Sequence, residues 1–363
     1  MNILLLTYQG DMAGSTNSIY YLASGLAKRG HLVVVGLRRE SLLYRLLQNT
    51  PLVICEPMTF GGKLDRENMR QIRDVVKRYE IKIINAQSSR DRYTSIFANW
   101  YYGMQVVVVH TRRQKPKSMG GFLQRYLYIK GTRSIITVSQ ELKNTFVRQG
   151  YPTAHIKVIY NGLPPQHFAA LNDLRVAQLR QQFGFTSQDV VIGCVSRPKS
   201  QAQLIAALPL LPLSVKVLFV GIEPNSLADI ARKYGVESQV LYAGKVSPEE
   251  VLNYYKLFSL KVLPSTMDGF GLVLLEAMGL GVPVVATRSE GLIDVLANEQ
   301  NGLWFEDGDI VQLAEKIKIA LYDNVRRQEL IENGYRAAHE TFSLEKTLDN
   351  YEAFFAELLV GSK

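Results

Sequence analysis

The first half of the chain repeats a short apolar run followed by an amphipathic stretch. Residues 2–7 form the first run, and residues 16–29 follow it with the spacing of a helix. Similar apolar runs recur at residues 31–36, 52–54, 81–84, 105–109, 134–138 and 156–159, with further helical patterns at residues 64–79 and 140–149. Continuous Val, Ile and Leu runs that alternate with helices are typical of a parallel sheet buried on both faces. The pattern predicts a doubly wound α/β domain.

The alternation stops at residues 160–165 and then starts again. This stretch, Tyr-Asn-Gly-Leu-Pro-Pro, has the glycine and prolines of a linker. After it, strands are expected at residues 190–195, 215–220, 239–243, 260–263 and 283–286, and a helical tail at residues 311–359. The pattern therefore predicts two α/β halves. Ligands of doubly wound sheets bind at the carboxyl ends of the strands, so we expect the site in the cleft between the halves.

Composition and charge narrow the class of protein. A hydrophobic content of 47% over 363 residues excludes a disordered chain. Cys55 and Cys194 are too far apart in sequence for a metal motif or a disulfide framework, which favours a reducing cytoplasm. The net charge of +9 is uneven, because residues 1–165 hold 24 Lys and Arg against nine Asp and Glu, whereas residues 166–363 hold 18 against 24. A basic first half favours anionic partners such as nucleic acid, lipid headgroups or phosphorylated substrates.

The segment from residue 263 to residue 278 carries the most chemical information. Gly269 and Gly271 precede a predicted helix, where free N–H groups form a site for a phosphate unless the glycines serve only a tight turn. Glu276 is the only charge between Gly269 and Thr287, so we expect it to be buried on an apolar helix. A buried carboxylate needs hydrogen bonds, which either a ribose diol or an internal partner could supply. Asp268 is either the N-cap of this helix or a ligand of sugar hydroxyls.

Residues 264–286 resemble the donor-site signature of the retaining family-4 glycosyltransferases of the GT-B fold. That signature places two Glu residues, at the spacing of Asp268 and Glu276, around Glu-Gly-Phe-Gly and Glu-Ala-Met. Further parts of the chain are similar to other family motifs: the linker at Tyr160-Asn161-Gly162, the glycine-rich loop and helix at Ala13-Gly14, Leu22-Ala23 and Arg29-Gly30-His31, and the start of the tail helix at residues 342–345. The resemblance covers essentially the whole chain.

The resemblance implies a fold and a separate binding function for each domain. The implied fold class is α/β, GT-B, with two Rossmann-like doubly wound domains that face a central cleft. Residues 1–165 would form the acceptor-binding domain and residues 166–343 the domain that binds the nucleotide-sugar donor. Residues 344–363 would form a helix that packs back on the first domain.

The resemblance also implies donor-binding residues. Glu276 matches the family Glu that holds the ribose hydroxyls, and Gly14 matches a glycine beside the donor phosphates. Asp268 matches the Glu that contacts the transferred sugar, but it is shorter by one methylene, which affects this contact and the choice of donor. The other positions implied to bind the donor are Ser265, Gly269, Phe270, Gly271 and Leu272, and the base-pocket loop Gly244, Lys245 and Val246.

Four catalytic residues follow from the same resemblance, and Asp268 is one of them through its contact with the transferred sugar. Arg197 and Lys199 match the family's diphosphate-binding cations, although the loop between them is shorter than usual. Two cations can stabilise the charge of a departing diphosphate without a metal. His110, at the end of a predicted strand and facing the cleft, matches a His near the transferred sugar. No cofactor and no bound metal are expected.

Two other charged stretches have competing interpretations. Arg112, Arg113, Lys115 and Lys117 form a basic run that is either a solvated loop or an acceptor or membrane surface. The aromatic residues that follow are Phe122, Tyr126 and Tyr128. Asp307-Gly308-Asp309 resembles a metal motif, but it precedes a predicted helix, so we interpret Asp309 as its N-cap.

The sequence therefore predicts a retaining glycosyltransferase that moves a sugar from a UDP, GDP or ADP sugar to an acceptor hydroxyl. The basic first half favours an anionic or lipid-linked acceptor of the bacterial cell envelope, such as a lipopolysaccharide core or a glycolipid. We expect a cytoplasmic protein that contacts the inner face of the membrane. We do not expect it to bind nucleic acid. Two alternatives are a sugar-nucleotide 2-epimerase and a non-catalytic protein that binds sugar nucleotides or a membrane surface.

Overall fold

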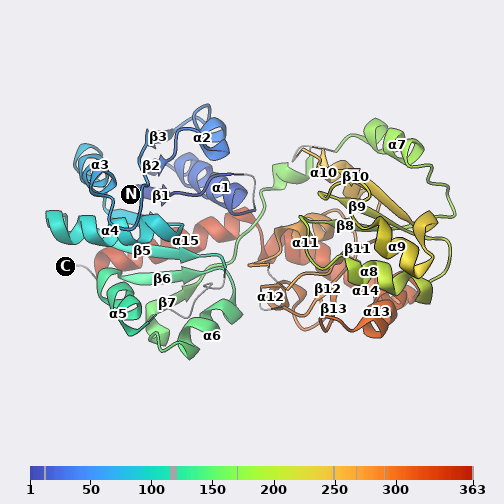
Figure 1. Cartoon of the computed structure of the whole chain (residues 1–363). Helices are drawn as coiled ribbons and strands as arrows, with labels where there is room; N and C mark the ends of the chain where they lie inside the picture. Colours follow the sequence, from blue (N-terminus) through green and yellow to red (C-terminus); the bar gives the residue numbers. More distant parts are fainter. Residues whose placement is uncertain are drawn as a thin grey trace. The chain divides into compact units, whose positions relative to one another are not determined.

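The computed structural model describes residues 1–11, 14–114, 121–169, 171–247, 250–266, 268–289 and 291–361. The chain forms two compact units (Figure 1). The first contains Met1–Gly162 and Leu344–Lys363, and the second contains Leu163–Ser343. The division between the units falls inside the stretch with the glycine and the two prolines.

The first unit is built on a parallel sheet with the strand order β3-β2-β1-β4-β5-β6-β7. Its strands are β1 (Asn2–Thr7), β2 (Leu32–Leu37), β3 (Val53–Pro57), β4 (Ile83–Ala86), β5 (Val107–Arg112), β6 (Ser134–Thr137) and β7 (Ile156–Val158). The connecting helices are α1 (Gly14–Lys28), α2 (Leu42–Leu47), α3 (Arg66–Arg78), α4 (Ser89–Tyr102), α5 (Phe122–Gly131) and α6 (Gln140–Arg148). A strand lies at each apolar run of the first half.

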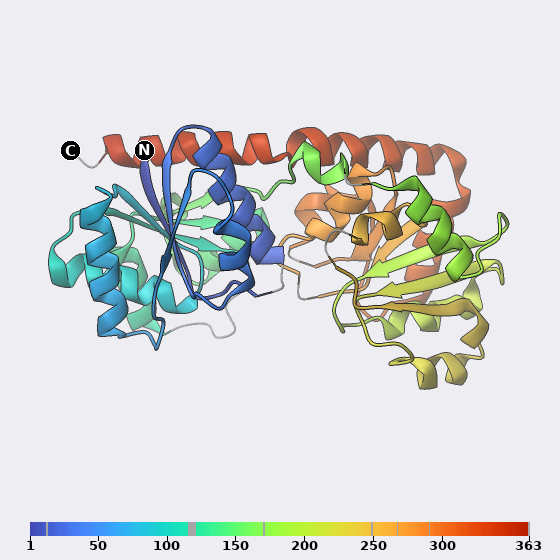
Figure 2. The ribbon, with the colours of Figure 1, turned by 90° about the horizontal axis from the view of Figure 1, so that it is seen from above.

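Helix α15 (Leu344–Val360) belongs to the first unit. Leu348 and Phe355 of this helix share a buried cluster with Leu22 of α1 and with one face of the sheet. The two helices approach closely at Gly25, where a Cβ atom would lie 2.6 Å from a methyl carbon of Leu348. Figure 2 shows α15, in red, beside the blue elements of its own unit.

The second unit contains a parallel sheet with the strand order β10-β9-β8-β11-β12-β13. Its strands are β8 (Val190–Val195), β9 (Val215–Val220), β10 (Val240–Gly244), β11 (Leu260–Leu263), β12 (Val284–Thr287) and β13 (Leu303–Phe305). Its helices include α7 (Asp173–Gln182), α8 (Ala202–Ala207), α9 (Ala228–Tyr234), α10 (Val251–Tyr255), α11 (Leu272–Gly279) and α12 (Ile293–Leu296). The strand β13 was not among the predicted strands.

The predicted helical tail is not one continuous run. It consists of α13 (Ile310–Tyr322), α14 (Asn324–Arg336), a π-helical segment (Ala337–Thr341) and α15. Asp323 interrupts the run, because its carboxylate accepts a hydrogen bond from Arg326 N and caps α14. Asp309 caps α13 in the same way through Gln312 N at 2.9 Å, which confirms its interpretation as an N-cap. Across the described ranges, we find no helix with the length and apolar character needed to cross a bilayer.

The order of the second sheet determines which loops meet. Strands β8 and β11 are direct neighbours, with Leu260 opposite Ile192. Because the strands are parallel, the loops that follow them leave from the same edge of the sheet. This edge brings the Arg197–Lys199 loop and the glycine-containing segment before α11 together.

Candidate active site

An ion pair joins the two loops at this edge. Lys199 Nζ lies 2.5 Å from Asp268 Oδ2, and the two side chains are only 17% and 20% exposed. Asp268 does not cap the following helix, because α11 begins at Leu272 with Gly271 at its N-cap position. The alternative interpretation of Asp268 as an N-cap is therefore wrong, and its carboxylate faces the loop after β8.

Gln201 holds the short loop after β8 in shape. Its side chain is buried, and the amide nitrogen Nε2 donates to Ser196 Oγ at 2.9 Å and to Arg197 O at 2.7 Å. Its amide oxygen Oε1 accepts a hydrogen bond from Lys199 N at 2.6 Å. One side chain thus fixes the backbone of both predicted catalytic cations, while the Arg197 side chain itself is exposed.

The backbone before α11 lies so close to Gly291 that this position has no room for a side chain. A Cβ atom on Gly291 would lie 1.9 Å from Asp268 O. Gly271 has a φ of +76°, which favours glycine. Phe270 is buried with its ring centroid 5.5 Å from that of Phe342, and Ser265 N donates to Thr287 Oγ1 at 2.9 Å. The N–H groups of Leu272 and Val273 open α11 directly behind this turn, where helix geometry supplies no intrahelical acceptor, while Leu274 N donates to Gly271 O at 2.8 Å.

Glu276 is buried on α11 and has protein partners. Its Oε2 accepts a hydrogen bond from the Tyr255 hydroxyl at 2.9 Å, and its Oε1 lies 3.4 Å from His167 Nε2. Burial, together with the Glu276 carboxylate, raises the pKa of Tyr255 well above its ordinary value, so the hydroxyl keeps its proton. The internal partner that the sequence left open exists, and the ribose contact stays a prediction.

The predicted base-pocket loop follows β10. Gly244 has a φ of +72°, and its carbonyl accepts a hydrogen bond from Gly221 N at 2.8 Å. Lys245 pairs with Glu223 at 2.7 Å, but both side chains are mostly exposed, so solvent screens the pair. Val246 is half-buried.

His110 lies in the interior of the first unit, where its side chain is 0% exposed. Its ring meets Tyr128 edge-on, with the centroids 5.0 Å apart. Burial, and then the charges of Arg92 and Arg112, keep the pKa of His110 well below its ordinary value, so the ring is neutral. Tyr128 of α5 covers the ring, and the expected orientation of His110 toward the cleft stays a prediction. A role near the transferred sugar stays a prediction.

Arg112 and Arg113 do not form the surface that the sequence predicted. Arg112 is buried with its guanidinium 5.0 Å from the centroid of the Phe146 ring, and burial lowers its pKa to about 9. Arg113 donates to Gln87 Oε1 and is half-buried. Arg112 is the last residue of β5 and lies in the interior, and the hydrogen bond to Gln87 holds Arg113, which follows the strand, against the same unit. Lys115 and Lys117 lie outside the described residues.

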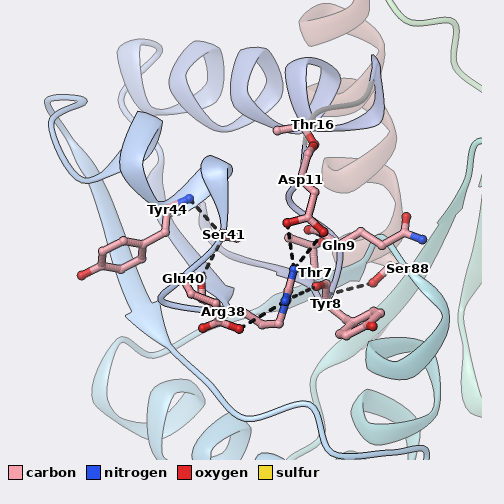
Figure 3. A network of polar contacts seen from close by, with 10 residues as sticks. All are labelled: Thr7, Tyr8, Gln9, Asp11, Thr16, Arg38, Glu40, Ser41, Tyr44 and Ser88. Atoms are coloured by element: carbon pink, nitrogen blue, oxygen red, sulfur yellow. Dashed lines mark hydrogen bonds and ion pairs between the residues drawn. The ribbon is translucent and has the colours of Figure 1, made fainter. Parts of the chain in front are cut away.

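The loop between β1 and α1 is anchored by side chains from α1 and from the loops that follow β2 and β4. Arg38 donates to both carboxylate oxygens of Asp11 at 3.1 Å and to Tyr8 O at 2.8 Å (Figure 3). Tyr8 N donates to Ser88 Oγ at 2.9 Å, and Thr16 Oγ1 donates to Asp11 O. These contacts fix the chain on either side of Gly14, which is the first residue of α1.

Sequence reasoning did not identify three residues that support this site. These residues, which contact the predicted site residues, are Gln201, Tyr255 and His167. Tyr255 and His167 lie far along the chain from Glu276, and Gln201 is part of no recognisable motif. Tyr255 offered a weak signal, because a buried carboxylate at Glu276 requires a donor. The linker position of His167 offered none.

Comparison with known proteins identifies the family. The family model described as Glycosyltransferase Family 4 matches residues 12–167, and the model described as Glycosyl transferases group 1 matches residues 177–337. An uncharacterized glycosyltransferase of Methanocaldococcus jannaschii is 30% identical over 227 residues, which cover 60% of this chain and 58% of that protein. N-acetyl-alpha-D-glucosaminyl L-malate synthase of Bacillus anthracis is 26% identical over 237 residues, which cover 63% of this chain and 61% of that protein. The matched region thus spans about three fifths of these two curated relatives.

Solved structures agree on the fold. The crystal structure of Anabaena HepE in complex with UDP superposes with a TM-score of 0.83 at 22% identity, and covers 98% of this chain and 100% of that chain. The two parallel-sheet units described above are those of the GT-B glycosyltransferases. Since the two family models together match most of the chain, it belongs to the glycosyltransferases of family 4, the glycosyl transferases group 1.

Proposed function

We propose that the chain is a retaining glycosyltransferase that moves a sugar from a nucleotide-diphosphate sugar to an acceptor hydroxyl. The observation that carries the proposal is the Lys199–Asp268 ion pair, which sets a cation and a carboxylate side by side at the carboxyl edge of a doubly wound sheet. Glu276 lies on the helix that follows, where Tyr255 orients its carboxylate. Membership of a glycosyltransferase family supports the same reaction.

Each of these residues has a proposed role. Glu276 accepts hydrogen bonds from the ribose hydroxyls, and Asp268 binds a hydroxyl of the transferred sugar. Arg197 and Lys199 bind the diphosphate and stabilise the charge that develops on it as the bond to the sugar breaks. The acceptor oxygen forms its bond on the same face of the sugar, and the departing phosphate takes the acceptor proton. The first N–H groups of α11 add a partial positive charge on the same side.

Uridine diphosphate is the proposed nucleotide of the donor. HepE, which shares the fold over its full length, was crystallised with UDP. The backbone-rich loop at Gly244 would line the base pocket, as the family resemblance implies. UDP-sugars are therefore the first donors to test, ahead of GDP- and ADP-sugars.

An anionic acceptor is proposed for the first unit. Residues 1–165 carry a large excess of Lys and Arg, which attracts negatively charged molecules. The name of the Bacillus anthracis relative joins an N-acetylglucosaminyl group to L-malate, a dicarboxylate. A phosphorylated or lipid-linked glycan of the cell envelope fits the same charge, and lipopolysaccharide core or a glycolipid are the acceptors we propose.

Helix α5 supports contact with an anionic membrane surface. Phe122, Leu123 and Tyr126 are 69%, 80% and 54% exposed, so three large apolar side chains face solvent near its start. Lys130 and Arg133 are exposed at its end. Exposed aromatic and apolar side chains beside cations are typical of helices that lie in the headgroup region of a bilayer. Tyr128 does not contribute, because it is buried against His110.

The decisive experiment is a donor screen followed by product analysis. UDP-, GDP- and ADP-sugars are added to the protein, and a ligand that binds the native state raises the melting temperature. The donor that binds is then incubated with and without acceptor extracts, and the products are identified by NMR. We expect an α- or β-glycoside that retains the donor's anomeric configuration. A new free sugar nucleotide formed without acceptor would instead indicate an epimerase, and donor binding with no product from any extract would indicate a binding protein.

A further inference from the structure

A lysine lies in the interior of the second unit. Lys261 stands inside β11 and its side chain is 0% exposed. Its Nζ donates to Val195 O at 3.0 Å and lies 3.4 Å from Val262 O. Burial of an ammonium group costs several kcal/mol unless nearby groups compensate for it. Two carbonyls compensate for only part of this cost, so the position of the charge requires an explanation.

The lysine ties β11 to the end of the neighbouring strand. Lys261 is opposite Gly193 in the sheet, and its side chain reaches along β8 to Val195, the last residue of that strand. The loop with the predicted diphosphate cations begins at the next residue. The buried ammonium therefore lies beneath the start of the Arg197–Lys199 loop, whose backbone Gln201 also holds through hydrogen bonds.

Several charged or titratable groups face this ammonium. Around Lys261 are Cys194 on β8, Lys199 after β8, Asp268 after β11, Glu276 on α11, and Tyr255 on α10, which contacts Glu276. Burial lowers the pKa of Lys261 to about 8, while Cys194, Asp268 and Glu276 act in the opposite direction and Lys199 adds to the lowering. The side chain is thus mostly charged at pH 7 and mostly neutral at pH 9.

We propose that Lys261 is a positioning residue of the donor site, which fixes the end of β8 and places a buried positive charge beneath the donor diphosphate. This inference rests on the proposed function, because it requires a nucleotide diphosphate above the Arg197–Lys199 loop. Binding of that anion favours the charged form of Lys261, so the protein takes up a proton when the nucleotide binds near pH 8. A lysine with only a structural role would not couple to the nucleotide.

The test is calorimetry of UDP binding to the full chain at pH 7.0, 8.0 and 8.8. Two buffers with different ionisation enthalpies report the protons taken up. For the wild type, we expect the Kd of UDP to rise about fivefold from pH 7.0 to 8.8, the size of one screened charge interaction, with proton uptake at pH 8.0. K261M should bind UDP with the wild type's alkaline Kd at all three pH values. Its proton uptake should fall to that of UDP itself.

Two further variants separate charge from structure. K261Q keeps a donor for Val195 O without the charge, and we expect it to lose the pH dependence as K261M does. Lys216 is a strand lysine of the same unit that also donates to a carbonyl, at Ser238, so K216M is the matched control and should keep the wild-type profile. Melting temperatures at pH 7.0 show whether each variant is folded.

The outcomes distinguish the two proposals. UDP binding with equal proton uptake in the wild type and K261M overturns this inference alone. A K261Q variant that keeps the wild-type pH dependence also overturns it. Failure of the wild type to bind UDP overturns the donor assignment, and this inference with it.

Discussion

Lys199 reaches from the loop after β8 to Asp268 in the segment before α11, and the ammonium and the carboxylate lie 2.5 Å apart. The two residues are 69 positions apart in sequence, and only the pairing of β8 with β11 brings their loops together. The carboxylate restricts the long lysine side chain to one place before any ligand arrives. Such preorganisation reduces the entropy that Lys199 would lose on contact with a diphosphate.

Replacement of both loop cations should affect turnover more than donor affinity. In R197M/K199M, we expect kcat to fall about 10²- to 10³-fold while KM for the donor changes less, because the negative charge on the leaving oxygen develops mainly in the transition state. Steady-state kinetics with the donor found in the screen provide the measurement. K233M, which removes an exposed lysine from α9, should behave as the wild type. A large increase in KM at unchanged kcat would contradict transition-state stabilisation.

The Tyr255–Glu276 hydrogen bond should contribute to nucleotide binding. E276Q is expected to weaken UDP binding by about 2 kcal/mol, the value of a charge-assisted hydrogen bond, and Y255F by about 1 kcal/mol. The two losses should not add in the double variant, because Tyr255 acts by orienting Glu276. Calorimetry measures all three. Y254F, on the same helix, is the matched control and should bind UDP as the wild type does. Unchanged UDP affinity in E276Q would contradict the assignment of Glu276 to the ribose.

Gln201 should control the geometry of the short loop. Q201L removes the hydrogen bonds to Ser196, Arg197 and Lys199, so we expect kcat to fall about tenfold and the free energy of unfolding to fall by about 1–3 kcal/mol. Gln203, two residues on, bonds instead to Asp307 and to Gly308 N. Q203L should therefore lose stability without losing turnover. Equal kinetic effects in the two variants would count against a role for Gln201 in placing the cations.

Unbroken apolar runs that alternate with helical patterns predicted the sheets well. A parallel strand is buried on both faces, so its residues form such a run. The burial of Glu276 was predictable for the same reason, since it is the only charge on an apolar helix. Contacts between distant residues were not predictable. Gln201 carries no motif, and its function depends on a loop that folds back on it. The inward direction of Arg112 also depends on helices packed around its strand, which its basic neighbours in sequence do not indicate.

Helix α5 should mediate binding to anionic bilayers. F122S/L123S removes two exposed apolar side chains, each of which contributes up to about 1.5–3 kcal/mol when buried in a membrane, so vesicle binding should weaken at least about tenfold. Sedimentation with phosphatidylglycerol-containing vesicles, compared with phosphatidylcholine vesicles, measures the effect. L174S changes an equally exposed leucine on α7 and should bind as the wild type. Equal binding of the wild type to both kinds of vesicle would contradict the proposed role of charge.

Glu352 should make the packing of α15 on its own unit sensitive to acid. Its carboxylate lies 2.6 Å from both His31 Nε2 and an Arg29 nitrogen. Burial opposes the change, but hydrogen bonds from His31 and Arg29 lower the pKa of Glu352 below its usual 4.5. A lowered carboxylate pKa adds stability that is present above pH 4.5 and is lost as the pH falls through the folded-state pKa.

E352Q should therefore be less stable than the wild type at pH 7, by about 1 kcal/mol for a partly exposed pair, and the difference should shrink below pH 4.5. Urea unfolding at several pH values gives the free energies. E357Q, at an exposed position on the same helix, should follow the wild type at every pH. A difference between E352Q and the wild type that is constant from pH 7 to pH 3 would show that Glu352 contributes through packing rather than through its charge.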